Sequence, residues 1–220
     1  LDVTIDIAGR KVKVDWGRSR VFDQEVGNLF LTLLSGDDAT VTAAAGGNLI
    51  CTNVKTGQKR RTRPQPMNTV EMLKLASKAL GIGPHQAMRS AENLYLSGYT
   101  SYPRTESSQY PRSFDFKDTL RTLSAQDSSV GAYAAELLRN GHAQARSGLD
   151  AGDHPPITPV GNPPSNFLSG DDARMYDLIT RHFLASISPD AKFLVTTATF
   201  QSGSGEMFST SGKKEIDAGF

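Results

Sequence analysis

Three consecutive residues near the middle of the chain, Tyr102, Pro103 and Arg104, could do covalent chemistry on a phosphate. Proline has a fixed φ angle and keeps the preceding residue extended, and residues i and i+2 of an extended chain face the same side. Tyr102 and Arg104 should therefore project together. A guanidinium binds phosphate oxygens through paired hydrogen bonds and favours the phenolate form of a neighbouring tyrosine. The spacing predicts a tyrosine nucleophile beside a phosphate-binding arginine.

Two hydroxyl residues, Thr105 and Ser107, follow this trio, and we expect both to contact nucleic acid. From residue type alone, a tyrosine buried in an ordinary turn is the commoner alternative, because tyrosine is a frequent core residue. His154 is likewise more often a hydrogen-bonded loop histidine than a catalytic group. Pro155 restricts the backbone of His154, which suits a side chain held in place.

A run of basic residues between positions 52 and 65 contains no acid. The run could contact phosphate or could be the charged, exposed edge of a sheet, and the sequence leaves both alternatives open. The whole chain is nearly neutral, with 24 Lys and Arg against 23 Asp and Glu, so any nucleic-acid contact must come from such a local patch. The run consists of Lys55, Lys59, Arg60, Arg61 and Arg63.

The composition excludes several classes of protein. With 220 residues, of which 38% are hydrophobic, the chain can form a packed core and is not disordered throughout. The single cysteine, Cys51, excludes an internal disulfide framework, and it forms no zinc-site spacing with the 4 histidines. No apolar run is long enough to span a membrane. Because the chain begins at Leu1 within a strand-like pattern, we expect a piece of a larger protein.

The first third and the end of the chain alternate apolar and polar residues as strands do. Residues 3–7 and 12–16 flank Ala8-Gly9-Arg10 and predict a β-hairpin, followed by a helix around residues 26–33. Further strands are predicted over residues 39–45, 48–56, 192–200 and 206–210.

The middle of the chain has helical periodicity. Asn68 is a predicted N-cap with Glu71 three residues later, and a turn at residues 81–83 separates this helix from a second one that starts at Pro84. Two helices joined this way suggest a helix-turn-helix, although most such pairs are only packing units. Further on, the pattern predicts a helix over residues 132–140, a loop over 142–170, and a helix capped by Asp171 or Asp172 and closed by Pro189.

The order of these elements predicts an α+β fold in which an antiparallel β domain is interrupted by a helical domain that carries Tyr102. The expected bounds are residues 1–66 for the first part of the β domain, 67–187 for the helical domain and 188–220 for the returning β part.

Residues 96–107 closely resemble the active-site segment of the type IA DNA topoisomerases in their topoisomerase III form, which reads as an aromatic residue, Ile or Thr, and then Ser-Tyr-Pro-Arg-Thr and an acid. Residues 67–71, the helix pair before the tyrosine, residues 150–159 and residues 176–183 are similar to the same family. The Asp-His-Pro-Pro-Ile-Thr-Pro string at residues 153–159 is most similar to the eukaryotic III-beta form.

This resemblance implies a reaction. Tyr102 would attack a phosphodiester of a single-stranded segment and form a 5′-phosphotyrosine link, which the freed 3′-hydroxyl later reverses. Arg104 would hold the scissile phosphate, and His154 would help stabilise the transition state. The exchange conserves bond energy and needs no ATP, in agreement with the lack of a Gly-x-x-x-x-Gly-Lys-Ser/Thr loop.

The resemblance also implies an architecture and a cofactor. The β part corresponds to the family's gate domain II, and the helical part to domain III with a winged-helix, CAP-like fold. The family binds Mg²⁺ through a Toprim domain with an Asp-x-Asp pair, and no two aspartates here are separated by one residue. We therefore expect no metal site in this chain and no DNA relaxation by the chain alone.

Partners follow from the same resemblance. The expected substrate is single-stranded DNA, with RNA as an alternative, and the expected partner protein carries a Tudor domain and an OB-fold. The expected location is the nucleus and also the cytoplasm, with roles in DNA repair and recombination and no membrane contact.

Two other functions compete with this one. Tyrosine recombinases and type IB topoisomerases also use a tyrosine but form a 3′ link, and here the residue three positions after His85 is Met88 instead of the arginine they need. From a different class, the chain could be a non-catalytic helix-turn-helix module for nucleic-acid binding or partner docking. The Tyr102-Pro103-Arg104 trio discriminates, because a module that only binds does not need it.

Overall fold

The computed structural model describes residues 3–35 and 49–220, which divide into two compact units. The sheet unit consists of residues 1–60 and 192–217, and the helical unit of residues 61–191 and 218–220. The helical unit is thus inserted between two parts of the sheet unit. The domain boundaries predicted from the sequence, between residues 66 and 67 and between residues 187 and 188, refer to the domains of the family and stay a prediction.

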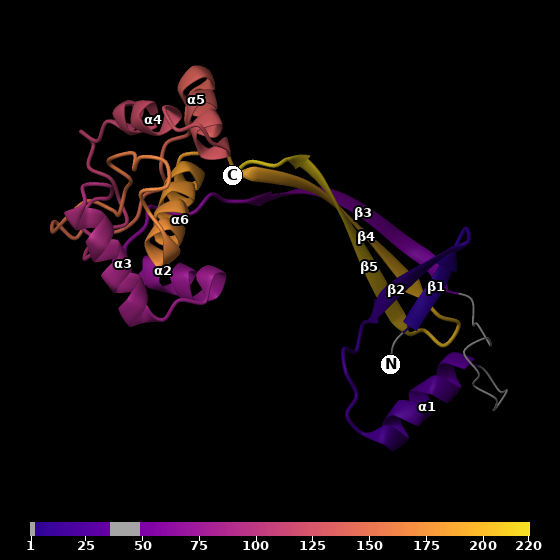
Figure 1. The fold of residues 1–220 in the computed structure, drawn as a ribbon. Helices are drawn as coiled ribbons and strands as arrows, with labels where there is room; N and C mark the ends of the chain where they lie inside the picture. Colours follow the sequence, from indigo (N-terminus) through magenta and orange to yellow (C-terminus); the bar gives the residue numbers. More distant parts are fainter. Residues whose placement is uncertain (1–2, 36–48) are drawn as a thin grey trace. The chain divides into compact units, whose positions relative to one another are not determined.

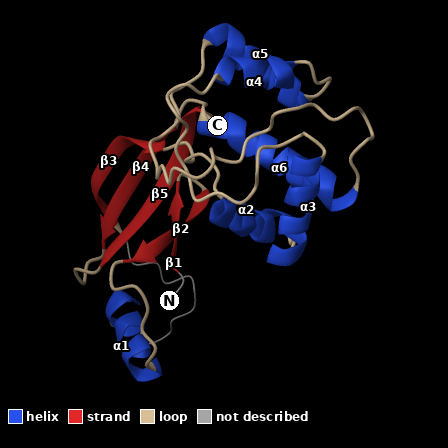
Figure 2. Ribbon diagram, turned by 90° about the vertical axis from the view of Figure 1, so that its left-hand side faces the viewer, coloured by secondary structure: helices blue, strands red, loops and turns tan. Residues whose placement is uncertain are grey.

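The sheet unit is one five-stranded layer in the order β1-β2-β5-β4-β3 (Figure 2). The pairs β1/β2, β2/β5 and β4/β5 are antiparallel, which confirms the predicted fold class. The strand predicted over residues 39–45 lies outside the described residues. The elements are β1 (Val3–Ile7), β2 (Arg10–Trp16), α1 (Gln24–Ser35), β3 (Ile50–Arg61), β4 (Ala191–Gln201) and β5 (Met207–Asp217).

The predicted hairpin is confirmed, with Val3 opposite Val14 and a turn whose Gly9 has a φ of 81°. A positive φ is accessible to glycine at little cost, so this turn suits its sequence. The core of the sheet unit contains Val14, Trp16, Phe200 and Phe208. Phe30 of α1 lies against it, with its ring centroid 4.8 Å from that of Trp16.

The helical unit contains six helical segments. Figure 1 labels five of them, α2 to α6. The predicted helix-turn-helix pair is present as α2 with its continuation η1, followed by α3. Helix α4 was not predicted. The segments are α2 (Thr69–Leu75), the π-helical η1 (Ala76–Leu80), α3 (Pro84–Leu96), α4 (Phe116–Ser124), α5 (Ser129–Asn140) and α6 (Gly170–Ser186).

Local sequence signals explain the ends of these helices. The Asn68 side chain accepts a hydrogen bond of 2.9 Å from the Glu71 N–H, which confirms the predicted N-cap. Gly81 ends η1 with a φ of 67°, and Pro84 occupies the first turn of α3. The prediction for α6 was wrong in detail, because Ser169 is at the N-cap position and both aspartates lie in the first turn.

Helix α6 joins two hydrophobic clusters. Met175, Tyr176 and Ile179 pack with α2 and α3, whereas Phe183 and Leu184 pack with α4 and α5. The loops that carry the functional motifs are therefore attached to a well-packed scaffold. None of the helices in the described ranges is long and apolar enough to cross a membrane.

Replacing Phe183 with alanine should destabilise the helical unit by about 3–5 kcal/mol, because it removes a large side chain from a closed core. Phe183 is 1% exposed, whereas Phe22 is 93% exposed and provides the matched control Phe22→Ala. Urea denaturation followed by circular dichroism measures both. Equal destabilisation by the two substitutions would contradict this assignment of the core.

Candidate active site

The two motifs singled out in the sequence lie side by side in the structure. The Ser101 N–H donates to the Thr158 carbonyl at 2.8 Å, and the Val160 N–H donates to the Tyr99 carbonyl at 2.9 Å. The Ser101 hydroxyl adds to this by accepting from the Thr158 N–H at 2.9 Å. We call this pairing of residues 99–101 with residues 156–160 the backbone clasp. The clasp places the residues just beyond it, Tyr102 and His154, next to each other.

Tyr102 contacts two aromatic rings and remains accessible. Its ring centroid is 4.8 Å from that of His154 and 5.1 Å from that of Tyr95, and both contacts are edge-to-face. Tyr102 is half-buried and His154 is exposed. The phenol is therefore not sealed within apolar packing, and a phosphate can approach it from solvent.

Arg104 lies on the same outward side of the segment and forms an ion pair with Glu92 of α3. Its Nε and Nη2 atoms donate to one oxygen, Glu92 Oε1, at 2.9 and 2.5 Å. The hydrogen bonds to Glu92, and then the negative charge of Glu92, raise the pKa of Arg104. Sequence analysis missed Glu92, because the contact between α3 and this later segment is a tertiary one.

The segment alternates strictly between outward and inward residues. Tyr102 and Arg104 face outward as predicted, whereas Pro103, Thr105 and Ser107 are buried. The Thr105 hydroxyl donates to the His154 carbonyl at 2.8 Å, and the Ser107 hydroxyl donates to Asp153 at 2.8 Å. The expected contact of Thr105 and Ser107 with nucleic acid stays a prediction, but in this structure both hydroxyls are bonded within the protein. Both hydroxyls hold the His154 loop.

Asp153 is the centre of this loop anchor. Its carboxylate accepts hydrogen bonds from the Glu106 N–H at 3.0 Å, the Ser107 hydroxyl at 2.8 Å and the Thr105 hydroxyl at 3.3 Å. The backbone donors at Glu106 and His154, and then the Ser107 hydroxyl, hold the pKa of Asp153 well below its ordinary value. Because the folded-state pKa is depressed, this stabilisation is complete above about pH 4 and is lost only as the pH falls further.

A groove of about 600 Å³ adjoins this anchor and includes Arg104. The start of α2 and the active-site segment both line this groove, and both were recognised in the sequence. The residues lining the groove are Asn68, Thr69, Val70, Arg104, Thr105, Glu106, Leu149 and Asp153.

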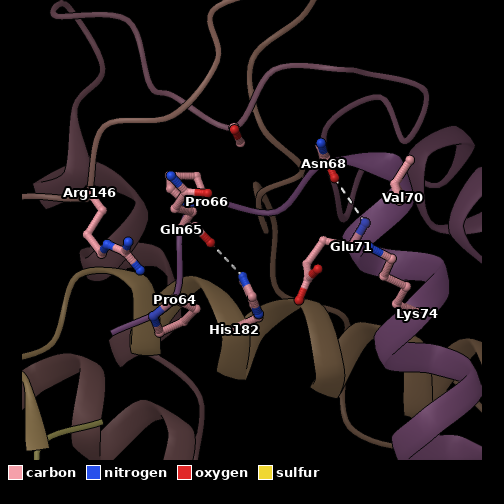
Figure 3. Close-up of a pocket in the computed structure, with 10 residues that line it drawn as sticks. Pro64, Gln65, Pro66, Asn68, Val70, Glu71, Lys74, Arg146 and His182 are labelled. Carbon is pink, nitrogen blue, oxygen red and sulfur yellow. Dashed lines mark hydrogen bonds between the residues drawn. The ribbon is translucent and has the colours of Figure 1, made fainter. Parts of the chain in front are cut away.

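A second cavity of about 290 Å³ lies between the start of α2 and α6 (Figure 3). Inside it His182 bonds the Gln65 carbonyl at 2.8 Å, and burial lowers the pKa of His182. Glu71 and Lys74 of α2 and Arg146 also line it. None of the three predicted catalytic residues lines this cavity, although Asn68 and Val70 line both it and the groove beside Arg104.

The basic run divides into exposed and structural members. Lys55, Lys59 and Arg60 are exposed on β3, as is the whole of that strand. The Arg61 guanidinium lies 5.3 Å from the centroid of the Phe220 ring. Arg63 bonds Asp190 at 2.8 Å and the Gln144 carbonyl, and the role of the basic run in nucleic-acid binding stays a prediction.

No group of three or more His, Cys, Asp or Glu side chains that could hold a metal ion occurs among the described residues. A magnesium site needs converging oxygen ligands. The resemblance places Mg²⁺ in a Toprim domain and not among these residues, so no step of the reaction is derived through a metal ion.

Comparison with known proteins gives the same family throughout. A family model described as DNA topoisomerase matches residues 3–220. The chain is 42% identical to DNA topoisomerase 3-beta-1 of Homo sapiens over 211 residues, which are 96% of the chain and 23% of that protein. It is 42% identical to DNA topoisomerase 3-beta of Arabidopsis thaliana over 215 residues and 37% identical to DNA topoisomerase 3-alpha of Homo sapiens over 198 residues.

The fold comparison agrees. The structure of full-length topoisomerase I from Thermotoga maritima superimposes with a TM-score of 0.67 at 19% identity, covering 98% of this chain and 34% of that one. The chain thus spans about a quarter of the length of the curated relatives it matches, 23% in the case of the first. By its motifs, its family match and its fold, this chain belongs to the type IA DNA topoisomerases.

Proposed function

We propose that this chain is the strand-cleaving part of a type IA topoisomerase and that Tyr102 cuts single-stranded DNA by transesterification. The observation that carries the proposal is the accessible Tyr102 ring in contact with the His154 ring, at 4.8 Å between centroids. Arg104 lies on the same outward side of the segment, beside a groove of about 600 Å³. A nucleophile, a hydrogen-bond donor and a phosphate-binding cation each lower the barrier to cleavage of a phosphodiester.

The reaction balances as an exchange of esters. The Tyr102 oxygen loses its proton and bonds to phosphorus, the bond from phosphorus to the 3′ oxygen breaks, and the 3′ oxygen takes a proton. Arg104 neutralises the charge that develops on the non-bridging oxygens. We assign His154, whose ring contacts that of Tyr102, the role of a hydrogen-bond donor to the phosphate in the transition state. Attack by the 3′-hydroxyl runs the same steps backwards and reseals the strand.

The polarity of the covalent link tests this function. The full-length protein is incubated with a single-stranded oligonucleotide labelled at one end and is then denatured. We expect the 3′-labelled fragment to stay attached to protein, because a 5′-phosphotyrosine link retains the downstream piece. Retention of the 5′-labelled fragment would identify the type IB or recombinase chemistry instead.

Relaxation of DNA requires more than this chain contains. The chain supplies the tyrosine but no described metal site, and it spans 23% of its human 3-beta-1 relative. We infer that Mg²⁺ is held by a Toprim domain outside these residues and that the 220 residues alone do not relax supercoiled DNA. RNA as a second substrate, a Tudor-domain partner, nuclear and cytoplasmic location, and roles in repair and recombination rest on the resemblance alone.

A further inference from the structure

The face of α3 that borders Tyr102 carries an acid whose position needs an explanation. Glu92 and Tyr95 are three residues apart on this helix and therefore lie on one face. Tyr95 contacts the ring of Tyr102, and Glu92 binds Arg104. A negative charge thus lies next to the place where a polyanion is expected to bind. The Glu92 carboxylate would repel nucleic acid there unless the carboxylate moves away.

The contact between Glu92 and Arg104 resembles a guanidinium binding a phosphate. Two donors on one edge of Arg104, Nε and Nη2, converge on a single carboxylate oxygen. This is the edge with which arginine grips carboxylate and phosphate oxygens. While Glu92 holds it, that edge is not available to a phosphodiester.

The ion pair is placed where another anion can replace it. The Arg104 side chain is 57% exposed and that of Glu92 is 39% exposed. Exposed pairs of this kind contribute little stability, because water and salt screen both charges. A phosphodiester that is already held by neighbouring contacts can therefore displace the carboxylate.

We propose that Glu92 occupies the phosphate-binding edge of Arg104 in the absence of nucleic acid and is displaced by a phosphodiester of the bound single strand. The assignment of the ligand rests on the proposed function of Tyr102. Glu92 is thus a positioning residue that keeps the Arg104 guanidinium oriented and sets how readily it accepts a phosphate. Glu92→Gln keeps the size of the side chain and a hydrogen-bond acceptor but removes the competing charge.

Binding of a fluorescent oligothymidylate to the full-length protein tests the proposal, with Tyr102→Phe present so that no cleavage occurs. We expect Glu92→Gln to increase affinity about two- to fivefold, the range that corresponds to losing an exposed charge pair. In the Arg104→Gln background the same substitution should have no effect, since no guanidinium is left to release. Glu136→Gln removes an exposed charge on α5 and controls for the change in net charge.

An equal gain in both backgrounds would overturn the proposal, because it would show general repulsion instead of competition for Arg104. A loss of affinity on Glu92→Gln would also overturn it. Unfolding midpoints confirm that the variants fold, which is expected for exposed residues. Since binding is measured without the Tyr102 hydroxyl, this result does not depend on covalent chemistry. If the end-label experiment showed no 5′-phosphotyrosine link, the proposed function of Tyr102 would be wrong, whereas the competition between Glu92 and a phosphate for Arg104 would still be tested by binding.

Discussion

Tyr102→Phe in the full-length protein should abolish the covalent protein–DNA complex while leaving binding of single-stranded DNA within about twofold. The substitution removes one oxygen atom, and the ring contacts with Tyr95 and His154 depend on the ring itself. Only the nucleophile is lost. Trapping of labelled oligonucleotide after denaturation measures the first effect, and fluorescence anisotropy measures the second.

The neighbouring tyrosine provides the control for this experiment. Tyr95→Phe removes a hydroxyl from the ring that packs against Tyr102, and 42% of Tyr95 is exposed. This variant should retain covalent trapping. If Tyr102→Phe trapped DNA as well as the unaltered protein does, another residue would be the nucleophile, and the chain would fit the alternative of a module that only binds.

Asp153→Ala should reduce the rate of covalent trapping about 100-fold, because small displacements of catalytic groups have effects of that size. The carboxylate fastens the active-site segment to the His154 loop through Glu106 and Ser107. Without it, the buried Ser107 hydroxyl and the Glu106 N–H lose their acceptor, and we expect His154 to be held less firmly against Tyr102. Rapid-quench measurement of cleavage at saturating oligonucleotide separates this effect from weaker binding.

The His154 side chain reports whether Asp153 acts through position. In the Asp153→Ala variant, the imidazole NMR signals should lose the shift caused by the Tyr102 ring, as they would in Tyr102→Ala. Asp150→Ala is the matched control. Asp150 lies in the same loop, but the hydrogen bond that its carboxylate accepts comes from the Gly152 N–H within that loop. Unchanged His154 signals together with slow cleavage would exclude a positioning role.

Local signals in the sequence predicted much of the fold. Asn68 with Glu71, Gly81 and Pro84 each determine a helix end through their own backbone chemistry, so the helix pair of α2 and α3 could be read directly. Helix α4 was missed although Phe116, Leu120 and Leu123 recur at helical spacing; the helix is short, and its two threonines have low helix propensity. The N-cap at Asp115 was the signal that could have found it.

The site was predicted less completely than the fold. In an extended chain alternate residues share a face, which is why Tyr102 and Arg104 were expected to project together. The same alternation places Thr105 and Ser107 on the opposite face. The pairing of Arg104 with Glu92 could not be predicted, because it depends on how a loop packs against a helix face. Asp153 stood within the recognised motif, but only the structure shows which donors surround it.

The backbone clasp has a consequence for resealing. Its hydrogen bonds join residues 99–101 to residues 156–160 within one compact unit, so we expect Tyr102 and His154 to move together. If this unit swings away to let another strand through, the DNA end attached to Tyr102 carries His154 with it. In the proposed reaction, Tyr102 and His154 would then not have to be brought together again before the 3′-hydroxyl returns.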